Sequence, residues 1–158
     1  MWRLLLCAVL CLCVQGKITH RHISADERDH FRVELPFGFD GNGVIKLEVT
    51  DVVAYGPYEN ATIDKTRFGF FLATIATEAQ VATDYMQNTC YLDDNRLIQL
   101  LDFEKWHPVD NPILKAELRF QGNDALQPGE YSLYYAACDQ TTGLSFDVRI
   151  EFYGEIGR

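Results

Sequence analysis

Hydrophobic and polar residues alternate with a period of two near the end of the chain. From position 144 onward every second residue is hydrophobic, and these residues are Leu144, Phe146, Val148, Ile150 and Phe152. Because successive side chains of a strand point to opposite faces, this stretch predicts an antiparallel strand with one buried and one solvated face. The polar run 138–143 before it ends in a glycine, which is typical of a hairpin connection from the preceding strand, 130–137.

Strand 130–137 is dense in tyrosine. Tyr131, Leu133 and Tyr135 share one face, and Ser132 and Tyr134 fall on the opposite one. Such aromatic side chains usually pack in the core between two sheets. The alternative is an exposed tyrosine face that is available to a partner.

Six further segments have the composition or the alternation of strands, and they are 17–24, 31–35, 45–50, 67–76, 97–103 and 114–120. Segment 67–76 is apolar without alternation, which predicts a central strand covered on both faces. Residues 40–43 are a strong hairpin signal. The only helix we expect is 78–87, with Val81, Ala82 and Tyr85 on one side. The pattern predicts one all-β domain, an antiparallel β-sandwich of seven to eight strands with one short helix.

Composition narrows the classes of partner. The chain has 158 residues, of which 47% are hydrophobic, too many for a disordered protein. Its formal charge of −9 and pI near 4.8 argue against binding of nucleic acid, because an acidic field repels phosphates.

The first sixteen residues have the pattern of a signal peptide. Arg3 precedes an apolar run of eleven residues, 4–14, which is shorter than the about twenty that a membrane helix needs. We expect cleavage ahead of Lys17; an uncleaved short anchor is the alternative. The domain then spans 17–154, and nothing from 17 to 158 is long and apolar enough to cross a membrane.

Cleavage of the leader changes the cysteine count from odd to even. Cys7, Cys11 and Cys13 lie in the leader, which leaves Cys90 and Cys138 with one possible intramolecular pairing. Closing that loop of roughly fifty residues would stabilise the fold by about 4 kcal/mol; two unpaired buried thiols are the alternative. The sequon at Asn60 predicts a glycosylated surface loop, and hence a glycoprotein.

No residue pattern indicates an enzyme, a cofactor or a metal site. His20 and His22 share a strand face but lack a third ligand, and His107 stands alone in a loop. The run Asp93, Asp94 and Asn95 lacks the rhythm of a calcium loop. Asp102 and Glu104 lie two positions apart and could resemble the carboxylates of a glycosidase, but such pairs usually come from separate elements. We therefore expect no catalytic residues.

Several motifs in order resemble one family. They are Phe37-Gly38-Phe39, the stretch 43–52 (GVIKLEVTDV), Gly69-Phe70-Phe71-Leu72, Cys90-Tyr91-Leu92-Asp93, and the stretch from Gly129 through Cys138 to Tyr153. This order is similar to the luminal domain of the GOLD-domain seven-transmembrane proteins, which include the lung seven-transmembrane receptor-like proteins, and especially to their plant and algal branch. An immunoglobulin domain fits less well, because Tyr131 lies seven rather than two positions before Cys138.

The resemblance implies a GOLD-like sandwich with a Cys90–Cys138 disulfide, facing the lumen of the Golgi apparatus or endosomes. In that family the domain precedes seven membrane helices and serves membrane trafficking, with receptor-like signalling proposed; it offers no catalytic residues. Residues 155–158 would begin the juxtamembrane linker, so we expect this chain to be an ectodomain fragment or a truncated product.

Three functional hypotheses follow. The first is a luminal recognition module of a Golgi seven-transmembrane protein that binds protein cargo or a ligand through a sheet face or loop. The second is an independently secreted binding protein with the same sandwich. The third is a small extracytoplasmic hydrolase that uses Asp102 and Glu104.

Overall fold

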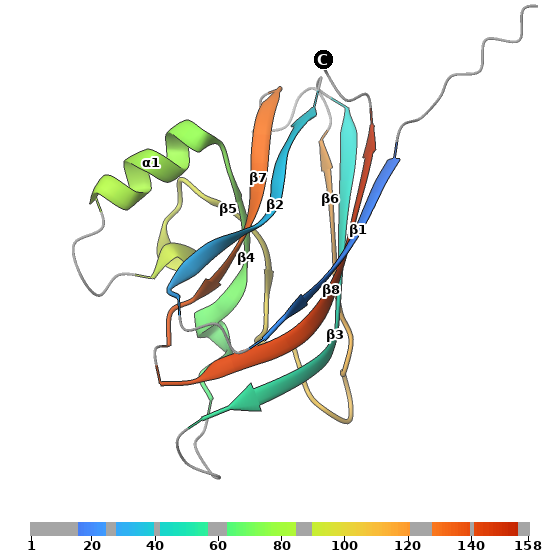
Figure 1. The fold of residues 1–158 in the computed structure, drawn as a ribbon, viewed down its shortest axis with the longest axis vertical. Coiled ribbons are helices and arrows are strands. Elements are labelled where there is room, and N and C mark those ends of the chain that lie inside the picture. Colours follow the sequence, from blue (N-terminus) through green and yellow to red (C-terminus); the bar gives the residue numbers. More distant parts are fainter. Residues whose placement is uncertain are drawn as a thin grey trace, which may run out of the picture.

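Two four-stranded antiparallel sheets face each other (Figure 1). The computed structural model describes residues 16–24, 28–39, 42–56, 63–84, 90–120, 128–139 and 141–154. Sheet A has the strand order β1 (Gly16–Ile23), β8 (Gly143–Gly154), β3 (Gly43–Tyr55) and β6 (Leu114–Phe120). Sheet B has the order β2 (His30–Phe39), β7 (Gly129–Ala137), β4 (Phe68–Ala73) and β5 (Ile98–Asp102). The predicted all-β sandwich is confirmed.

The main core lies between the sheets and is rich in aromatic rings. The five hydrophobic residues of β8 that alternation predicts to be buried are all at most 4% exposed. Phe146 contacts the rings of Phe70, Phe103 and Tyr135 at centroid distances between 5.1 and 5.6 Å. Rings in such tilted and edge-on arrangements contribute beyond their buried area.

A second, smaller core covers the outer face of sheet B. The helix α1 (Ile75–Asp84) and the short 3-10 helix η2 (Tyr91–Asp93) lie against this face, and another 3-10 turn, η1 (Lys65–Arg67), precedes β4. Val81 of α1 packs with Phe71, Tyr91 and Tyr134. Tyr134 is therefore only 2% exposed and Ser132 only 1%, so the possibility of an exposed tyrosine face is wrong.

Two turns predicted as hairpins instead connect the two sheets. Segment 40–43 leads from β2 of sheet B to β3 of sheet A, and segment 138–143 leads from β7 of sheet B to β8 of sheet A. Strands β7, β8 and β3 are central, so each already has a neighbour on both sides from elsewhere in the chain. A turn sequence determines that the chain reverses, but the available ladder partners determine which strands pair.

Several local boundaries differ from the predictions, and two of the differences have a clear cause. The helix begins at Ile75 rather than 78 because the Thr74 hydroxyl accepts a hydrogen bond from the Thr77 backbone N–H. In β2 the alternation breaks at register shifts between Arg32 and Phe37, so Leu35 is 64% exposed although the alternation of 31–35 places it on the hydrophobic face.

Cys90 and Cys138 form the predicted disulfide, with Cα atoms 5.2 Å apart. It joins the start of η2 to the end of β7, and so it holds η2 against the outer face of sheet B. The predicted leader up to residue 15, the sequon at Asn60 and the linker 155–158 lie outside the described residues. No helix within the described ranges has the length and apolar character that crossing a bilayer requires.

Candidate recognition face

The outer face of sheet A lies open on the side opposite α1 (Figure 1). We call this surface the sheet A face. Its side chains are His20 and His22 of β1, Asp147, Arg149 and Glu151 of β8, Lys46, Glu48 and Thr50 of β3, and Lys115, Glu117 and Arg119 of β6. In the part of the chain that the structure describes, no helix packs against it, in contrast to the covered face of sheet B.

Charges alternate across the strands of this face. In one row, Lys46 of β3 lies opposite Glu151 of β8 and Glu117 of β6. In the next row the signs are inverted, with Glu48 opposite Arg149 and Lys115. Opposite charges that lie directly across antiparallel strands stabilise the pair by about 0.2–1 kcal/mol each. The register of the three strands therefore produces a checkerboard of charge.

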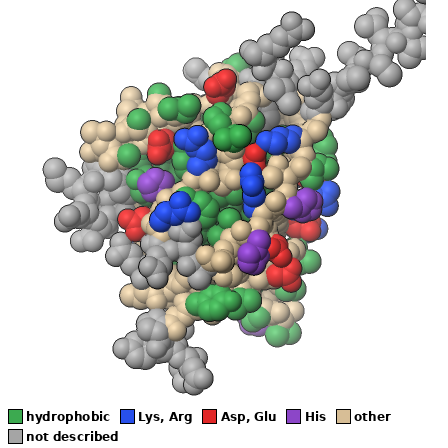
Figure 2. Space-filling model, viewed as in Figure 1, with side chains coloured by type: hydrophobic (Ala, Val, Ile, Leu, Met, Phe, Trp, Pro, Cys, Tyr) green, Lys and Arg blue, Asp and Glu red, His purple; other side chains and the backbone are tan. Residues whose placement is uncertain are grey.

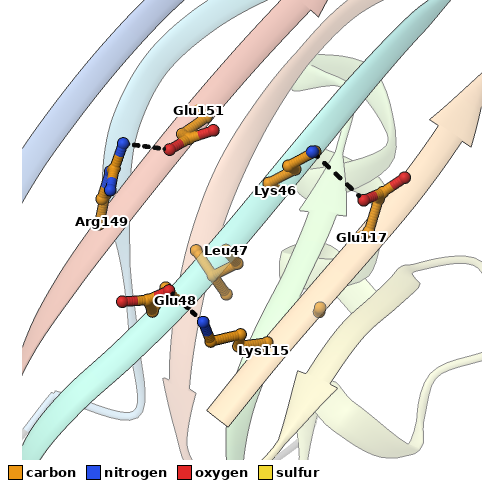
Figure 3. A pocket seen from close by; sticks show the side chains of 8 residues that line it. Lys46, Leu47, Glu48, Lys115, Glu117, Arg149 and Glu151 are labelled. Atoms are coloured by element: carbon orange, nitrogen blue, oxygen red, sulfur yellow. Dashed lines mark ion pairs between the residues drawn. The ribbon is translucent and has the colours of Figure 1, made fainter. Parts of the chain in front are cut away.

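Specific ion pairs form within this checkerboard (Figure 3). Lys115 Nζ lies 2.8 Å from Glu48 Oε2, and Lys46 Nζ lies 3.5 Å from Glu117 Oε2. Along β8, Arg149 Nη2 is 2.5 Å from Glu151 Oε1. These side chains border a shallow depression over β8, β3 and β6.

Two carboxylates of the sheet A face, Glu48 and Glu117, have lowered pKa values. The hydrogen bond from Lys115 lowers the pKa of Glu48 below its ordinary value. The hydrogen bond from Arg119 does the same to the pKa of Glu117, with Lys46 adding a smaller attraction. Both shifts favour the ionised form of these two carboxylates.

The two histidines of β1 lie at one end of this face. His22 Nδ1 is 2.7 Å from Asp147 Oδ1, and His20 points to solvent from the same face, as their spacing predicts. Among the described residues no group of three potential metal ligands comes together. The geometry thus gives His22 an acidic hydrogen-bond partner.

The other candidate residues form local contacts elsewhere in the fold. Asp93 pairs with Arg67 at 2.9 Å, and Asp94 pairs with Arg96 at 2.6 Å. The Asp102 carboxylate accepts a hydrogen bond from the backbone N–H of Glu104. His107 accepts hydrogen bonds from the backbone of its own loop through Nδ1. Asn95 lies in the turn between Asp94 and Arg96.

Sequence reasoning missed a buried carboxylate between the sheets. Glu34 is only 3% exposed, and its Oε1 and Oε2 pair with Lys17 and Arg21 of β1 at 2.5 and 3.5 Å. Lys17 and Arg21 lie on the side of β1 opposite the two histidines, so they reach across to β2. Figure 2 shows basic, acidic and histidine side chains gathered on the side of the molecule where β1 and β2 lie in front.

His30 was likewise not singled out by the sequence. Its ring centroid lies 3.9 Å from that of Tyr91, and its Nε2 is 3.7 Å from Glu78 Oε1 of α1. Burial lowers the pKa of His30 below its ordinary value, and attraction by Glu78 and Asp29 offsets only part of this effect. The residue connects β2 to the cover of sheet B.

Comparison with known proteins identifies a family that matches this chain. A protein-family model described as "CAND6/7, N-terminal domain" matches residues 20–154, which include every strand apart from the first part of β1. No solved structure matches the chain.

Proposed function

Because the chain belongs to the CAND6/7 N-terminal domain family, a family of GOLD-like domains, we propose that it is the luminal recognition domain of a Golgi-associated seven-transmembrane protein. The parent protein would belong to the plant and algal branch of the GOLD-domain seven-transmembrane, receptor-like family and act in membrane trafficking. Its disulfide supports an oxidising compartment. Its membrane helices would follow residue 158, and Asn60 would carry the glycan.

The observation that carries this proposal is the contrast between the two outer sheet faces. Sheet B is covered by α1 and η2, which are held there by a second core and the disulfide. Sheet A presents a checkerboard of acidic and basic side chains on three adjacent strands. We assign recognition to the sheet A face because it is the broader rigid surface that these elements leave open to solvent.

The chemistry of this face fits a protein partner. Exposed ion pairs each contribute about 0–1 kcal/mol, so a partner with complementary charges replaces them at little cost. Charges arranged in both signs select the partner and its orientation more than they add affinity. A polyanion such as nucleic acid would meet Glu48, Glu117 and Glu151 together with the net charge of −9.

The proposed role is contact rather than catalysis. The carboxylates of Asp93, Asp94 and Asp102 are engaged by Arg67, by Arg96 and by the backbone N–H of Glu104. These bonds support a role in local turns. Hydrolytic activity that disappears in D102N would contradict this part of the proposal.

Carboxylate footprinting tests the assignment of the face. The chain is labelled with a water-soluble carbodiimide inside the secretory pathway of cells and, separately, after purification. We expect Glu48 and Glu151 to be labelled less in cells than in the purified protein, while Asp93, on the covered side, is labelled equally in both. Equal labelling of Glu48 and Glu151 in the two samples would contradict recognition by this face.

A second, simpler observation tests the membrane part of the proposal. We expect the reading frame of the full-length gene product to continue past Arg158 into seven apolar segments of about twenty residues each. A stop codon directly after Arg158 would instead support an independently secreted β-sandwich binding protein.

A further inference from the structure

We propose that two copies of this chain pair through β6 across a twofold axis at Ala116, which joins their A sheets into one eight-stranded sheet. This interface uses the free edge of β6, whose Lys115 and Glu117 also belong to the sheet A face. The argument starts from the four strands that end the two sheets, since an edge strand presents N–H and C=O groups that another strand can pair with.

Three of the four edges are poorly suited to such pairing. Edge β2 contains Pro36 and two register shifts, and edge β5 has only five residues and a register shift against β4. Edge β1 has no acidic residue, so self-pairing would place its cations together. Two of those cations, Lys17 and Arg21, already close this side of the sandwich by pairing with Glu34 of β2.

Edge β6 has none of these obstacles to pairing. It has seven residues in unbroken register with β3, and proline is absent from it. Among the described strands it is paired on one side only. Beside it, a depression between β5 and β6 is bordered by half-buried Leu100 and Leu101 and by Ile113, which is 43% exposed. A strand added to β6 would cover apolar surface that is open in the single chain.

The charges of β6 select the register of this pairing. When two A sheets join into one, side chains on the outer face of one copy must lie opposite side chains on the outer face of the other. The twofold axis must therefore lie between two copies of the same residue, rather than between two successive positions of the strand. Centring on Glu117 gives the greatest overlap, but it places Glu117 opposite itself and Lys115 opposite Arg119 of the second copy. Like charges directly opposite are destabilising. That register is therefore disfavoured.

Centring on Ala116 makes every charged contact favourable. Lys115 of each copy then lies opposite Glu117 of the other, which gives two symmetric ion pairs on the outer face. On the inner face Leu114 lies opposite Leu118 of the second copy, and the two Ala116 residues meet on the axis. Centring on Leu118 also opposes unlike charges, over an equal five residues of β6. The depression beside β6 is bordered by residues 113–117, however, so the register centred on Ala116 places the second strand closer to this apolar surface.

Charge reversal with rescue tests both the dimer and its register. Sedimentation equilibrium of the purified chain, over a range of concentrations, gives the dimer dissociation constant. We expect K115E and E117K each to raise it at least about tenfold, because each places like charges opposite. The double variant K115E/E117K restores unlike pairs between the two copies and should return it to within about threefold of the unsubstituted chain. R32E, which reverses an exposed charge on β2 of sheet B, is the matched control and should leave it unchanged.

A cysteine on the axis provides a second readout that tolerates weak pairing. Residues directly opposite in antiparallel strands have Cα atoms about 4.5–5.5 Å apart, within the range of a disulfide. A116C should therefore form covalent dimers on oxidation, and E117C should form far fewer. Near-ultraviolet circular dichroism shows that each variant is folded. The proposal would be overturned if the unsubstituted chain were monomeric and A116C formed no covalent dimer. It would also be overturned if K115E left the dimer dissociation constant unchanged, or if K115E/E117K did not restore it.

Discussion

Lys17 Nζ on β1 lies 2.5 Å from the buried Oε1 of Glu34 on β2, so an ion pair connects edge strands of the two sheets. The two charges differ in exposure, since the side chain of Lys17 is 49% exposed and that of Glu34 only 2%. If Lys17 is removed, the buried Glu34 carboxylate keeps only Arg21, at 3.5 Å, as a charged partner. The loss of the pair therefore costs more at the buried carboxylate than at the lysine, which is half exposed to water.

We expect K17M to lower the free energy of unfolding by about 1–2 kcal/mol, because it leaves a buried charge with a weakened partner. The matched control is K46M, which breaks the exposed pair with Glu117 and should change stability by less than about 0.5 kcal/mol. Urea unfolding measures both. Equal costs for the two variants would show that the burial of Glu34 does not matter.

The ring of His30 makes stability depend on pH. Burial lowers its pKa in the folded protein below the ordinary value of 6.5, so the unfolded chain binds this proton more readily. The contribution of His30 is therefore fully present above about pH 6.5 and is lost as the pH falls below that value. Glu78, Asp29, Arg28 and Tyr91 are the charged and aromatic groups that face it.

Urea midpoints at about pH 7.5 and about pH 5.5 measure this effect. We expect H30Q to lose less stability on acidification than the unsubstituted chain does, while H20Q, which removes an exposed histidine of β1, keeps the original dependence. An NMR titration of His30 should give a midpoint below pH 6.5. A midpoint above it would reverse the sign of the prediction.

Tyr134 is buried under α1, and its hydroxyl has no hydrogen-bond partner among the described residues. We expect Y134F to change the free energy of unfolding by less than about 0.5 kcal/mol or to stabilise the protein, since no hydrogen bond is lost. Y134A should cost about 3 kcal/mol, because it removes a ring stacked on Phe71. A large loss in Y134F would reveal a partner for the hydroxyl.

The alternation of apolar residues was sufficient to predict most of the fold, because strands with one buried face have a period of two. It predicted the buried positions of β8 and of residues 45–50 in β3, and the buried character of β4 followed from its lack of alternation. It missed the burial of Ser145 and the continuation of β3 to Tyr55. It could not predict the environment of Tyr134, since the helix that covers this residue is distant from it in the sequence. The same limit applied to the turns at 40–43 and 138–143, whose flanking strands find their partners elsewhere.

The candidate site was less predictable than the fold. The outward positions of Arg149 and Glu151 followed from the pattern of β8, but the checkerboard depends on the registers of β3 against both β8 and β6. Glu34 occupies a position that the alternation assigns to the solvated face. Register shifts in β2 and the approach of β1 bury it, and neither is visible in the local sequence.

The disulfide between Cys90 and Cys138 holds the cover of sheet B in place. We expect C90A/C138A to lower the free energy of unfolding by about 4 kcal/mol, since the unfolded chain loses a constraint on a long loop. When the native protein is unfolded without reductant, an alkylating agent should modify neither Cys90 nor Cys138. Mass spectrometry with and without reduction measures this directly, and two alkylated cysteines without reduction would contradict the pairing.

Site-specific photo-cross-linking is the most direct test of whether this domain works by contact through the sheet A face. A photoreactive amino acid replaces Arg149 on that face or, as the matched control, exposed Gln80 of α1, in the chain expressed in the secretory pathway. The account predicts a defined luminal protein cross-linked from position 149 and lost when E48K and E151K are added, with none from position 80. Cross-links from position 80 alone would contradict it.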